Sequence, residues 1–401
     1  KFCSRVSVEH AGPRLGSLGA IFILLKSALG AGLLNFPWAF AKAGGIHNAV
    51  TVELASLVFL VSGLVILGYS SSVSGRCTYQ AVVREMCGLA IGHLCEICFI
   101  FNLFMISVAF LVIMDDQLGK RELTSRSIPS RNLSACSPLL HDTLESTSRV
   151  IDQMSLLLAS LVLEFALFVL QMTFECAPVC RMSSWASTFT VIPTICFGFQ
   201  CHEASITIYS NMENQRLSHW ILVCVISMIV CLIIYSLTGV YGYLTFGKEV
   251  KADVLMSYSS DDVVMIIARL LFAVSLVTIY PIVLLLGRSV IQDHLLRRWR
   301  PCAGVSALES RSRYVVTVLW ITVTLLFAIF VPDISKIISV IGGISAFFIF
   351  IFPGLCLMFA MHGFCVPRVI LTLWGAFTLV CGAFIFGQST TITVMQILGK
   401  I

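Results

Sequence analysis

Ten long apolar segments run through this sequence, and each is long enough to cross a lipid bilayer as a helix. Such a helix needs about 20 mostly apolar residues. The segments occupy residues 17–40, 47–71, 91–114, 153–173, 186–209, 219–245, 263–290, 314–331, 334–360 and 368–391. Only 12% of the 401 residues are charged, and the mean hydropathy is +0.95. The pattern predicts an all-α polytopic membrane protein and excludes secreted, disordered and nucleic-acid-binding proteins.

Short loops join the segments, which predicts a single transmembrane domain over residues 17–391. Residues 1–16 and 392–401 are then short tails. The basic residues of the first tail place it in the cytoplasm by the positive-inside rule. The spans carry most of the 16 cysteines, so we expect free thiols rather than a disulfide framework.

Basic loops set the orientation of the spans. Cytoplasmic orientation is predicted for the loop that contains Arg76 and Arg84, and for a loop whose arginines are Arg288, Arg297, Arg298, Arg300, Arg311 and Arg313. The number of crossings between these two loops must be even, but five are visible, so one crossing is hidden or false. The conflict falls in residues 115–152, where four arginines favour the inside and the acceptor sequence Asn132-Leu-Ser134 favours the outside.

Two spans contain residues that a continuous membrane helix would not select. The segment Leu25–Trp38 combines a lysine, two glycines and a proline, and Ile192–Glu203 combines a proline, a glycine and the pair His202-Glu203. Either segment alone is also compatible with a helix-packing face of small residues. Two interrupted helices in corresponding halves of a chain are typical of inverted-repeat transporters, because unwound backbone at this depth lines a cavity.

A broken helix offers two kinds of backbone group to a ligand. The N–H groups that begin the second half favour a carboxylate, and the carbonyl groups that end the first half favour an ammonium group or a metal cation. An α-amino acid carries both charges. We expect its carboxylate at the first break and its amine and side chain at the second. The predicted substrate-binding residues are Ser27, Gly30, Ala31, Gly32, Phe197, Gly198 and Phe199.

The same segments resemble a known family. Ser27–Trp38 and Phe199–Ala204 resemble the first and sixth helices of the sodium-coupled neutral amino acid transporters, solute carrier family 38, in the amino acid/auxin permease group. Two further runs that fit this family are Ser236–Gly247 and Ile341–Gly354. The resemblance covers about 17–116 and 184–391.

The resemblance implies an amino acid–polyamine–cation transporter fold of 10–11 transmembrane helices, with two inverted five-helix repeats. It implies secondary active transport of neutral, glutamine-like amino acids by alternating access, coupled to sodium and electrogenic. Only four visible spans precede the second broken helix, where the family has five, which agrees with the count of crossings. Residues 117–183 are anomalous because they do not resemble the family's fourth and fifth helices.

The sequence departs from the family at a position that bears on the coupling ion. Members usually carry an asparagine four residues before the first glycine of the first helix, and Lys26 stands there. Its ammonium group could replace a bound sodium ion, titrate as a proton site, or only pair with a carboxylate and hold helices together. The candidate ion-coupling residues are Lys26, Glu203, Ser275 and Thr278, the last two in the helix that resembles the family's eighth. Sodium coupling is our first expectation and proton coupling the second.

Four other polar residues lie within the predicted spans. We expect Glu53, Glu164 and Arg269 to be ties between helices or anchors at their ends. Asn102 either faces the substrate or joins two helices.

Other function classes fit less well. The sequence contains no His-Glu-x-x-His, Gly-x-Ser-x-Gly or Walker-type motif, so we predict no catalytic residues and no enzyme. Cys95-Glu-Ile-Cys98 has no second pair at zinc spacing, so we predict no metal site and no cofactor beyond the transported Na+ or H+. An amino-acid sensor on a transporter fold remains an alternative. The expected partners are a neutral L-amino acid and the bilayer, at the plasma membrane rather than the lysosome.

Overall fold

A computed structural model describes residues 15–124, 191–258, 263–299, 305–331, 333–360 and 366–397. These residues are almost entirely helical, as expected where lipid cannot satisfy backbone hydrogen bonds. The α-helices are α1 (Ser17–Ala28), α2 (Phe36–Lys42), α3 (Ile46–Ser74), α4 (Tyr79–Cys87), α5 (Leu89–Thr124), α9 (Ile192–Gly198), α10 (His202–Asn211), α11 (Leu217–Phe246), α12 (Val263–Trp299), α13 (Val305–Phe330), α14 (Ile334–Ala346), α15 (Phe352–Ala360) and α16 (Val366–Ile397). Shorter turns are the 3₁₀-helices η1 (Ala31–Asn35), η3 (Gly247–Glu249) and η4 (Val254–Ser257) and the π-helix η5 (Phe347–Ile351).

Seven helices in the described ranges are long and apolar enough to cross a membrane, and a bent pair, Ser17–Ala28 with Ala31–Lys42, makes an eighth. These eight confirm the predicted spans at 17–40, 47–71, 91–114, 219–245, 263–290, 314–331, 334–360 and 368–391. The predicted span at 153–173 and the start of the span at 186–209 lie outside the described residues. Most of residues 115–152, where the orientation signals conflict, and most of the anomalous segment 117–183 also lie outside the described residues. The helix α5 continues through residue 124.

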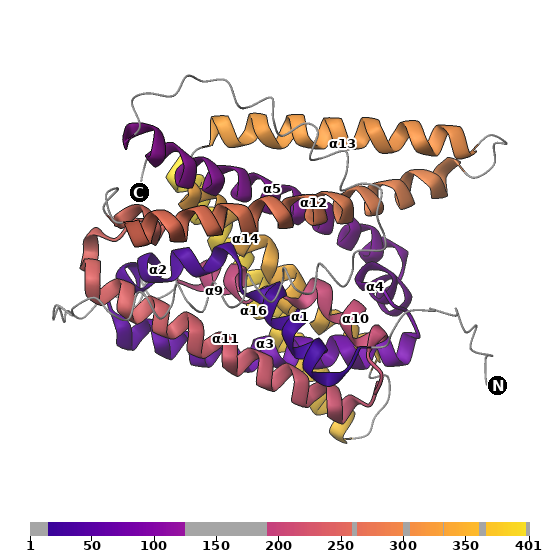
Figure 1. The fold of residues 1–401 in the computed structure, drawn as a ribbon. Helices are drawn as coiled ribbons and strands as arrows, with labels where there is room; N and C mark the ends of the chain where they lie inside the picture. Colours follow the sequence, from indigo (N-terminus) through magenta and orange to yellow (C-terminus); the bar gives the residue numbers. More distant parts are fainter. Residues whose placement is uncertain are drawn as a thin grey trace, which may run out of the picture.

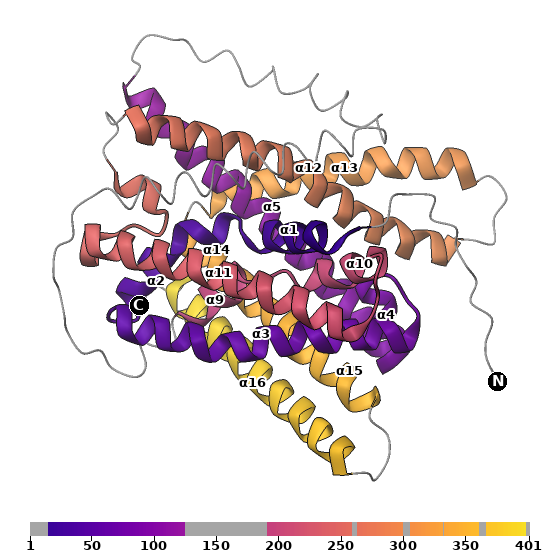
Figure 2. The same cartoon turned by 60° about the horizontal axis from the view of Figure 1, so that its bottom comes forward.

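The interrupted helices lie between two groups of long helices (Figures 1 and 2). On one side α3 and α11 run side by side, and on the other α12 and α13 pack against α5. Between them, α1 contacts α11, and α9 packs against α14. The breaks therefore lie in the interior of the bundle.

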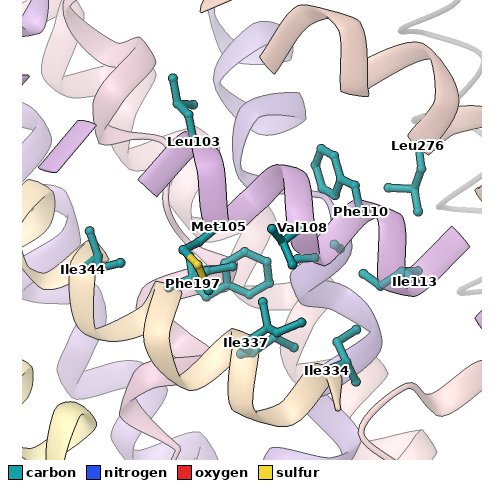
Figure 3. Close-up of a cluster of buried hydrophobic side chains, with 14 of the residues drawn as sticks. Leu103, Met105, Val108, Phe110, Ile113, Phe197, Leu276, Ile334, Ile337 and Ile344 are labelled. Carbon is teal, nitrogen blue, oxygen red and sulfur yellow. The ribbon is translucent and has the colours of Figure 1, made fainter. Parts of the chain in front are cut away.

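Buried apolar side chains form a core on each side of the breaks. One core joins α4, α5, α12 and α14, and the other joins α1, α2, α3 and α11. In Figure 3, Phe197 of α9 lies beside Met105 of α5 and close to Ile337 of α14. Phe197, a predicted substrate-binding residue, is thus part of the first core.

One predicted span is not a plain α-helix. Between α14 and α15 the chain forms the π-helical turn η5, in which the N–H of Phe352 donates to the carbonyl of Phe347. Pro353 follows and has no N–H to continue an α-helical ladder, which explains why the register changes here. The two interruptions predicted from the sequence did not include this one.

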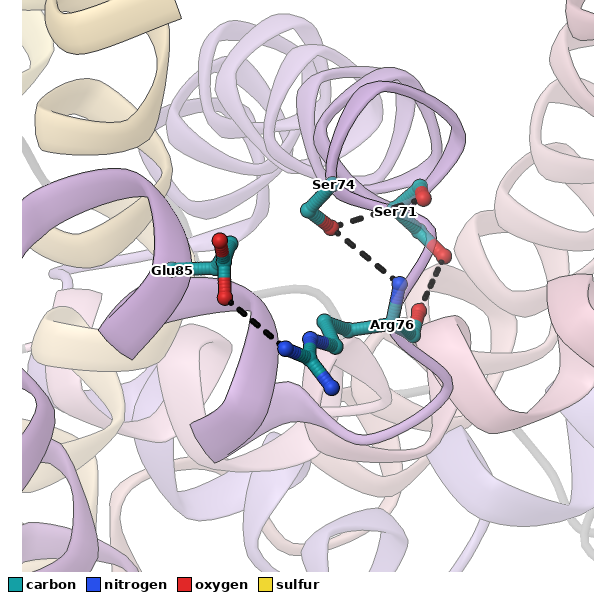
Figure 4. Close-up of polar contacts among 4 residues, drawn as sticks. All are labelled: Ser71, Ser74, Arg76 and Glu85. Carbon is teal, nitrogen blue, oxygen red and sulfur yellow. Dashed lines mark hydrogen bonds and ion pairs between the residues drawn. The ribbon is translucent and has the colours of Figure 1, made fainter. Parts of the chain in front are cut away.

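The short helix α4 links α3 to α5, and two ion pairs in its last turn tie it to the chain on either side. Ser71 at the end of α3 donates its hydroxyl to the carbonyl of Arg76 at 2.9 Å, and the Arg76 side chain pairs with Glu85 of α4 at 3.1 Å (Figure 4). In the same turn of α4, Arg84 pairs with Glu96 of α5. These contacts fix α4 across the connection between two membrane spans.

Candidate functional site

The first break separates α1 from the helical segment that follows it. Leu29 (φ −71°, ψ 109°) and Gly30 (φ −161°, ψ −147°) both leave the helical region. The chain re-enters a helix as η1 and continues into α2, and the two halves are bent by 47°. The predicted interruption of the first span is confirmed.

The second break lies between α9 and α10. Pro193 is in the first turn of α9, where its missing N–H costs no hydrogen bond. The N–H of Phe199 still donates to Ile195 at 2.9 Å, but the chain is non-helical at Gln200 before α10 begins. His202 anchors α10 because its Nε2–H donates to the carbonyl of Leu60 in α3 at 3.0 Å. The second predicted interruption is confirmed as well.

The two breaks contact each other through glycine backbone. A Cβ atom added to Gly32 would lie 2.7 Å from the Cα of Gly198, and one added to Gly198 would lie 2.6 Å from Cε2 of Phe36. Both positions therefore exclude a side chain. Gly30 is different, because an added Cβ would meet nothing within 4 Å and its φ of −161° suits any residue.

Tyr235 of α11 joins the ends of both first half-helices. Its hydroxyl lies 2.7 Å from the carbonyl oxygen of Ala28, at the end of α1, and 2.9 Å from that of Gly198, at the end of α9. Its ring stacks on Phe36 at 4.2 Å and meets Phe199 edge-on at 4.9 Å. Both carbonyls end a first half-helix, where the sequence predicted that carbonyl groups bind an ammonium group or a cation. The hydroxyl has one proton and donates it to one of these carbonyls at a time.

Tyr235 was not among the predicted site residues. It lies in an ordinary apolar span, and its partner Ala28 is 207 residues away in sequence. The only available signal was that a tyrosine hydroxyl buried in a membrane helix needs a hydrogen-bond acceptor.

Two amides hold Glu203, and within the described residues no basic side chain pairs with it. Asn102 of α5 and Gln200 of the second break donate to its Oε1 at 2.7 and 3.0 Å. Ser345 of α14 donates to the Oε1 of Gln200 at 2.5 Å. Asn102 is fully buried, and within the described residues its Oδ1 has no hydrogen-bond partner. The network links α5, the second break and α14, and in it Asn102 joins two helices.

The other ion-coupling candidates are on α1 and α12. Lys26 is half-buried in the last turn of α1, where a positive charge suits the helix end, and Ser27 beside it is exposed. Ser275 is buried on α12, and the exposed Thr278 donates its hydroxyl to the Ser275 carbonyl at 2.7 Å. Within the described part of the chain, no hydrogen bond joins Ser275 or Thr278 to either break.

Of the polar residues expected to be ties or anchors, one ties two helices and one anchors a loop to a helix. The buried Glu53 of α3 accepts a hydrogen bond from Ser236 of α11 at 2.5 Å. Arg269 of α12 donates to the carbonyls of Leu255 at 2.7 Å and Tyr258 at 3.1 Å, which fixes the loop before it. Glu164 lies outside the described residues.

A buried carboxyl group lies in the same loop, between two spans. Asp253 accepts hydrogen bonds from the N–H of Leu255 at 2.9 Å and from the side-chain amide of Gln117. Burial raises its pKa from the ordinary 3.8 to about 7, helped by the nearby Asp116, while these hydrogen bonds and Arg269 act in the opposite direction. The group is therefore close to half-ionised at neutral pH.

Comparison with known proteins gives one family over nearly the whole chain. The family described as transmembrane amino acid transporter protein matches residues 14–126 and 139–397. Human solute carrier family 38 member 8 is 53% identical over 414 residues, which cover 96% of this chain and 95% of that protein. Sodium-coupled neutral amino acid transporter 7 of Danio rerio is 40% identical over 403 residues, covering 94% of this chain and 86% of the relative.

A solved structure shares the fold at low sequence identity. The crystal structure of MhsT in complex with L-phenylalanine superimposes with a TM-score of 0.54 at 15% identity, and it covers 94% of this chain and 100% of that one. The likeness confirms the predicted class of transporter fold.

Proposed function

This chain belongs to the transmembrane amino acid transporter protein family, as its sequence motifs predicted, and on that premise we propose that it moves neutral L-amino acids across a membrane by sodium-coupled secondary active transport. Glutamine-like substrates, electrogenic uptake and alternating access complete the proposal. The names of the relatives, which include a sodium-coupled neutral amino acid transporter, support it.

The crossing of the two breaks is the observation that carries the proposal. Gly32 and Gly198 touch through backbone in the interior of the bundle, and the Tyr235 hydroxyl reaches the carbonyl ends of α1 and α9. The carbonyl ends of α1 and α9 and the start of the segment Ala31–Lys42 thus lie close together in the interior of the bundle. An α-amino acid, whose ammonium and carboxylate groups are both bonded to the same carbon atom, matches this arrangement.

In this proposal the segment Ala31–Lys42 receives the substrate carboxylate. The N–H groups at its start, at Ala31 and Gly32, have no partners within a regular helix. Gly30 contributes open space beside the backbone, and Ser27 lies one turn before it. At the second break, Phe197, Gly198 and Phe199 face the amine and the side chain.

Glu203 is our first choice for the group that binds the coupling cation. Both of its hydrogen-bond partners donate to the same oxygen, Oε1, and they stabilise the charged carboxylate. A carboxylate inside a membrane span is costly without a positive partner. A sodium ion at Glu203, with a contribution from Lys26, Ser275 and Thr278, would supply that charge. A proton would neutralise it as well, and this is the observation that favours proton coupling as the second candidate function.

Transport assays at fixed substrate concentration separate these functions. We expect labelled glutamine to enter cells with an inward current that falls when choline replaces sodium, at both pH 6.5 and pH 8. A current that ignores sodium and grows at acidic pH would replace sodium coupling with proton coupling. Binding of glutamine by purified protein without uptake in liposomes would identify a sensor and refute transport.

Lys26→Asn provides the matched variant for the ion. It places an amide where the resemblance expects one, so we predict steeper sodium dependence with little change in substrate preference. Sodium and pH responses identical to those of the unaltered protein would show that Lys26 acts only as a helix contact.

The chain is an integral multi-pass membrane protein by the length and apolar character of its helices. We propose the plasma membrane as its location, with the substrate and the bilayer as partners. Surface biotinylation of intact cells tests the location, since a lysosomal protein would escape labelling.

A further inference from the structure

A second cluster of contacts lies away from the breaks, where α4 packs against η5 and α15. Tyr79, Val83 and Cys87 are spaced four residues apart on α4 and therefore share one face of the helix. The facing side chains, also four residues apart, are Phe348, Phe352 and Cys356.

The two faces run alongside each other in matching order. The ring of Tyr79 meets Phe348 at 5.5 Å and Phe352 at 6.3 Å, and its hydroxyl donates to the Phe348 carbonyl at 3.1 Å. Two turns further along, the Sγ atoms of Cys87 and Cys356 are 3.7 Å apart. Two thiols in van der Waals contact thus close this interface.

We propose that Cys87 and Cys356 form a reversible disulfide that locks α4 to α15 under oxidising conditions. The sulfur atoms need to approach from 3.7 Å to about 2.05 Å, a shift that side-chain rotation and a small movement of α4 can supply. Both cysteines are free thiols in this structure.

The reaction needs a two-electron oxidant, and hydrogen peroxide is the one we specify. Cys87 is half-buried and reacts first, because Cys356 is fully buried. Its thiolate attacks one peroxide oxygen, the O–O bond breaks, and a sulfenic acid and water form. The Cys356 sulfur then displaces the hydroxyl as a second water, so two thiols and one peroxide give one disulfide and two waters.

The location favours a transient bond over a structural one. The loop that carries Arg76 and Arg84 is cytoplasmic by the positive-inside rule, and cytoplasmic thiol pools keep cysteines reduced. Small-molecule thiols would therefore reverse the disulfide by exchange.

The lock reaches the candidate site through one continuous span. α15 extends η5 and α14, and Ser345 of α14 donates to Gln200 at the second break. Fixing α15 against α4 restrains the span that holds this contact. We therefore expect the disulfide to lower amino-acid uptake. This expectation rests on the proposed function, whereas the formation of the disulfide does not.

The test uses the full chain in native membranes. After treatment with hydrogen peroxide and blocking of free thiols, mass spectrometry of the digested protein should detect a linked pair of peptides containing Cys87 and Cys356. Peroxide should lower amino-acid uptake several-fold, and dithiothreitol should restore it. Cys87→Ser and Cys356→Ala should each abolish the linked peptide and the peroxide effect. Cys98→Ser, a half-buried thiol on α5, is the matched control and should keep both.

The outcomes separate the parts of the proposal. Absence of the linked peptide in the unaltered protein, or a link from Cys87 to another cysteine, would overturn the site. A linked peptide with unchanged uptake would overturn the lock. If no uptake is measurable before oxidation, the proposed transport function fails, and the linked peptide still decides whether the disulfide forms.

Discussion

The hydroxyl of Tyr235 lies 2.7 Å from the carbonyl oxygen of Ala28, the residue at which α1 ends. It also lies 2.9 Å from the carbonyl of Gly198 at the end of α9. Because a hydroxyl has one proton, it donates to one of these carbonyls at a time. Tyr235 can therefore shift its hydrogen bond when a cationic group approaches the other carbonyl.

Tyr235→Phe should reduce uptake several-fold while leaving the amount of protein at the membrane nearly unchanged. Phenylalanine keeps the stacking on Phe36 but removes the one hydrogen bond that the two carbonyls share, at a cost of about 1–3 kcal/mol. Uptake and surface labelling, measured in the same cells, test this. Tyr209→Phe removes a hydroxyl that bonds to Gln215 far from the carbonyl pair, and it should have little effect on uptake. Equal losses in both variants would contradict a special role for Tyr235.

Substitutions at Gly30 and Gly32 should separate substrate contact from packing. Gly30→Val should fold normally, because its Cβ meets no protein atom within 4 Å, and it should abolish uptake by filling the space beside the backbone. Gly32→Ala should lower the melting temperature, because its Cβ would lie 2.7 Å from the Cα of Gly198. Overpacking of this kind costs about 1–3 kcal/mol. Thermal melts and uptake of both variants check this pair, and normal uptake in Gly30→Val would remove Gly30 from the site.

Glu203→Gln should remove the dependence of uptake on the coupling cation. The variant keeps the shape of the side chain but loses the charge that the cation neutralises, so we expect the response to sodium or pH to fall at least several-fold. Glu53→Gln is the control, since Glu53 is a membrane carboxyl group bonded to Ser236 on another pair of helices. An unchanged cation response in Glu203→Gln would assign Glu203 a structural role through Asn102.

Asp253→Asn should stabilise the protein relative to the unaltered chain as the pH rises. The folded-state pKa of Asp253, about 7, lies above the ordinary 3.8, so its contribution to stability is intact below about pH 4 and is lost as the pH rises through 7. Asparagine does not ionise, and the Oε1 of Gln117, which has no hydrogen-bond partner in the described structure, can accept its N–H after an amide rotation.

Melting temperatures of the two proteins at pH 5.5 and pH 8 measure this effect. The unaltered protein and the variant share all other titrating groups, including Asp116 and Arg269 near residue 253. The difference between the proteins should therefore favour Asp253→Asn more at pH 8 than at pH 5.5. A difference independent of pH would contradict the raised pKa.

Composition and residue type were sufficient to predict the eight spans in the described ranges and the two breaks. Apolar length defines a membrane helix, and the glycines Gly30 and Gly198 lie at the points where the backbone departs from the helix. The contacts across the breaks were not predictable, because they depend on how distant segments pack. Asn102 meets Glu203 across 101 residues, and a single sequence carries no record of that proximity. Tyr235 was missed for the same reason.

The π-helical turn η5 also has a consequence for comparing sequences within the family. A π-turn holds one residue more than an α-turn while the segments on both sides keep their faces. A relative with a regular helix here would present the same side chains to α4 with one residue fewer. An ungapped alignment through residues 347–351 would then be out of step by one position, about 100° of helical rotation. Evolutionary inference about Phe352 or Cys356 therefore requires alignment by structure.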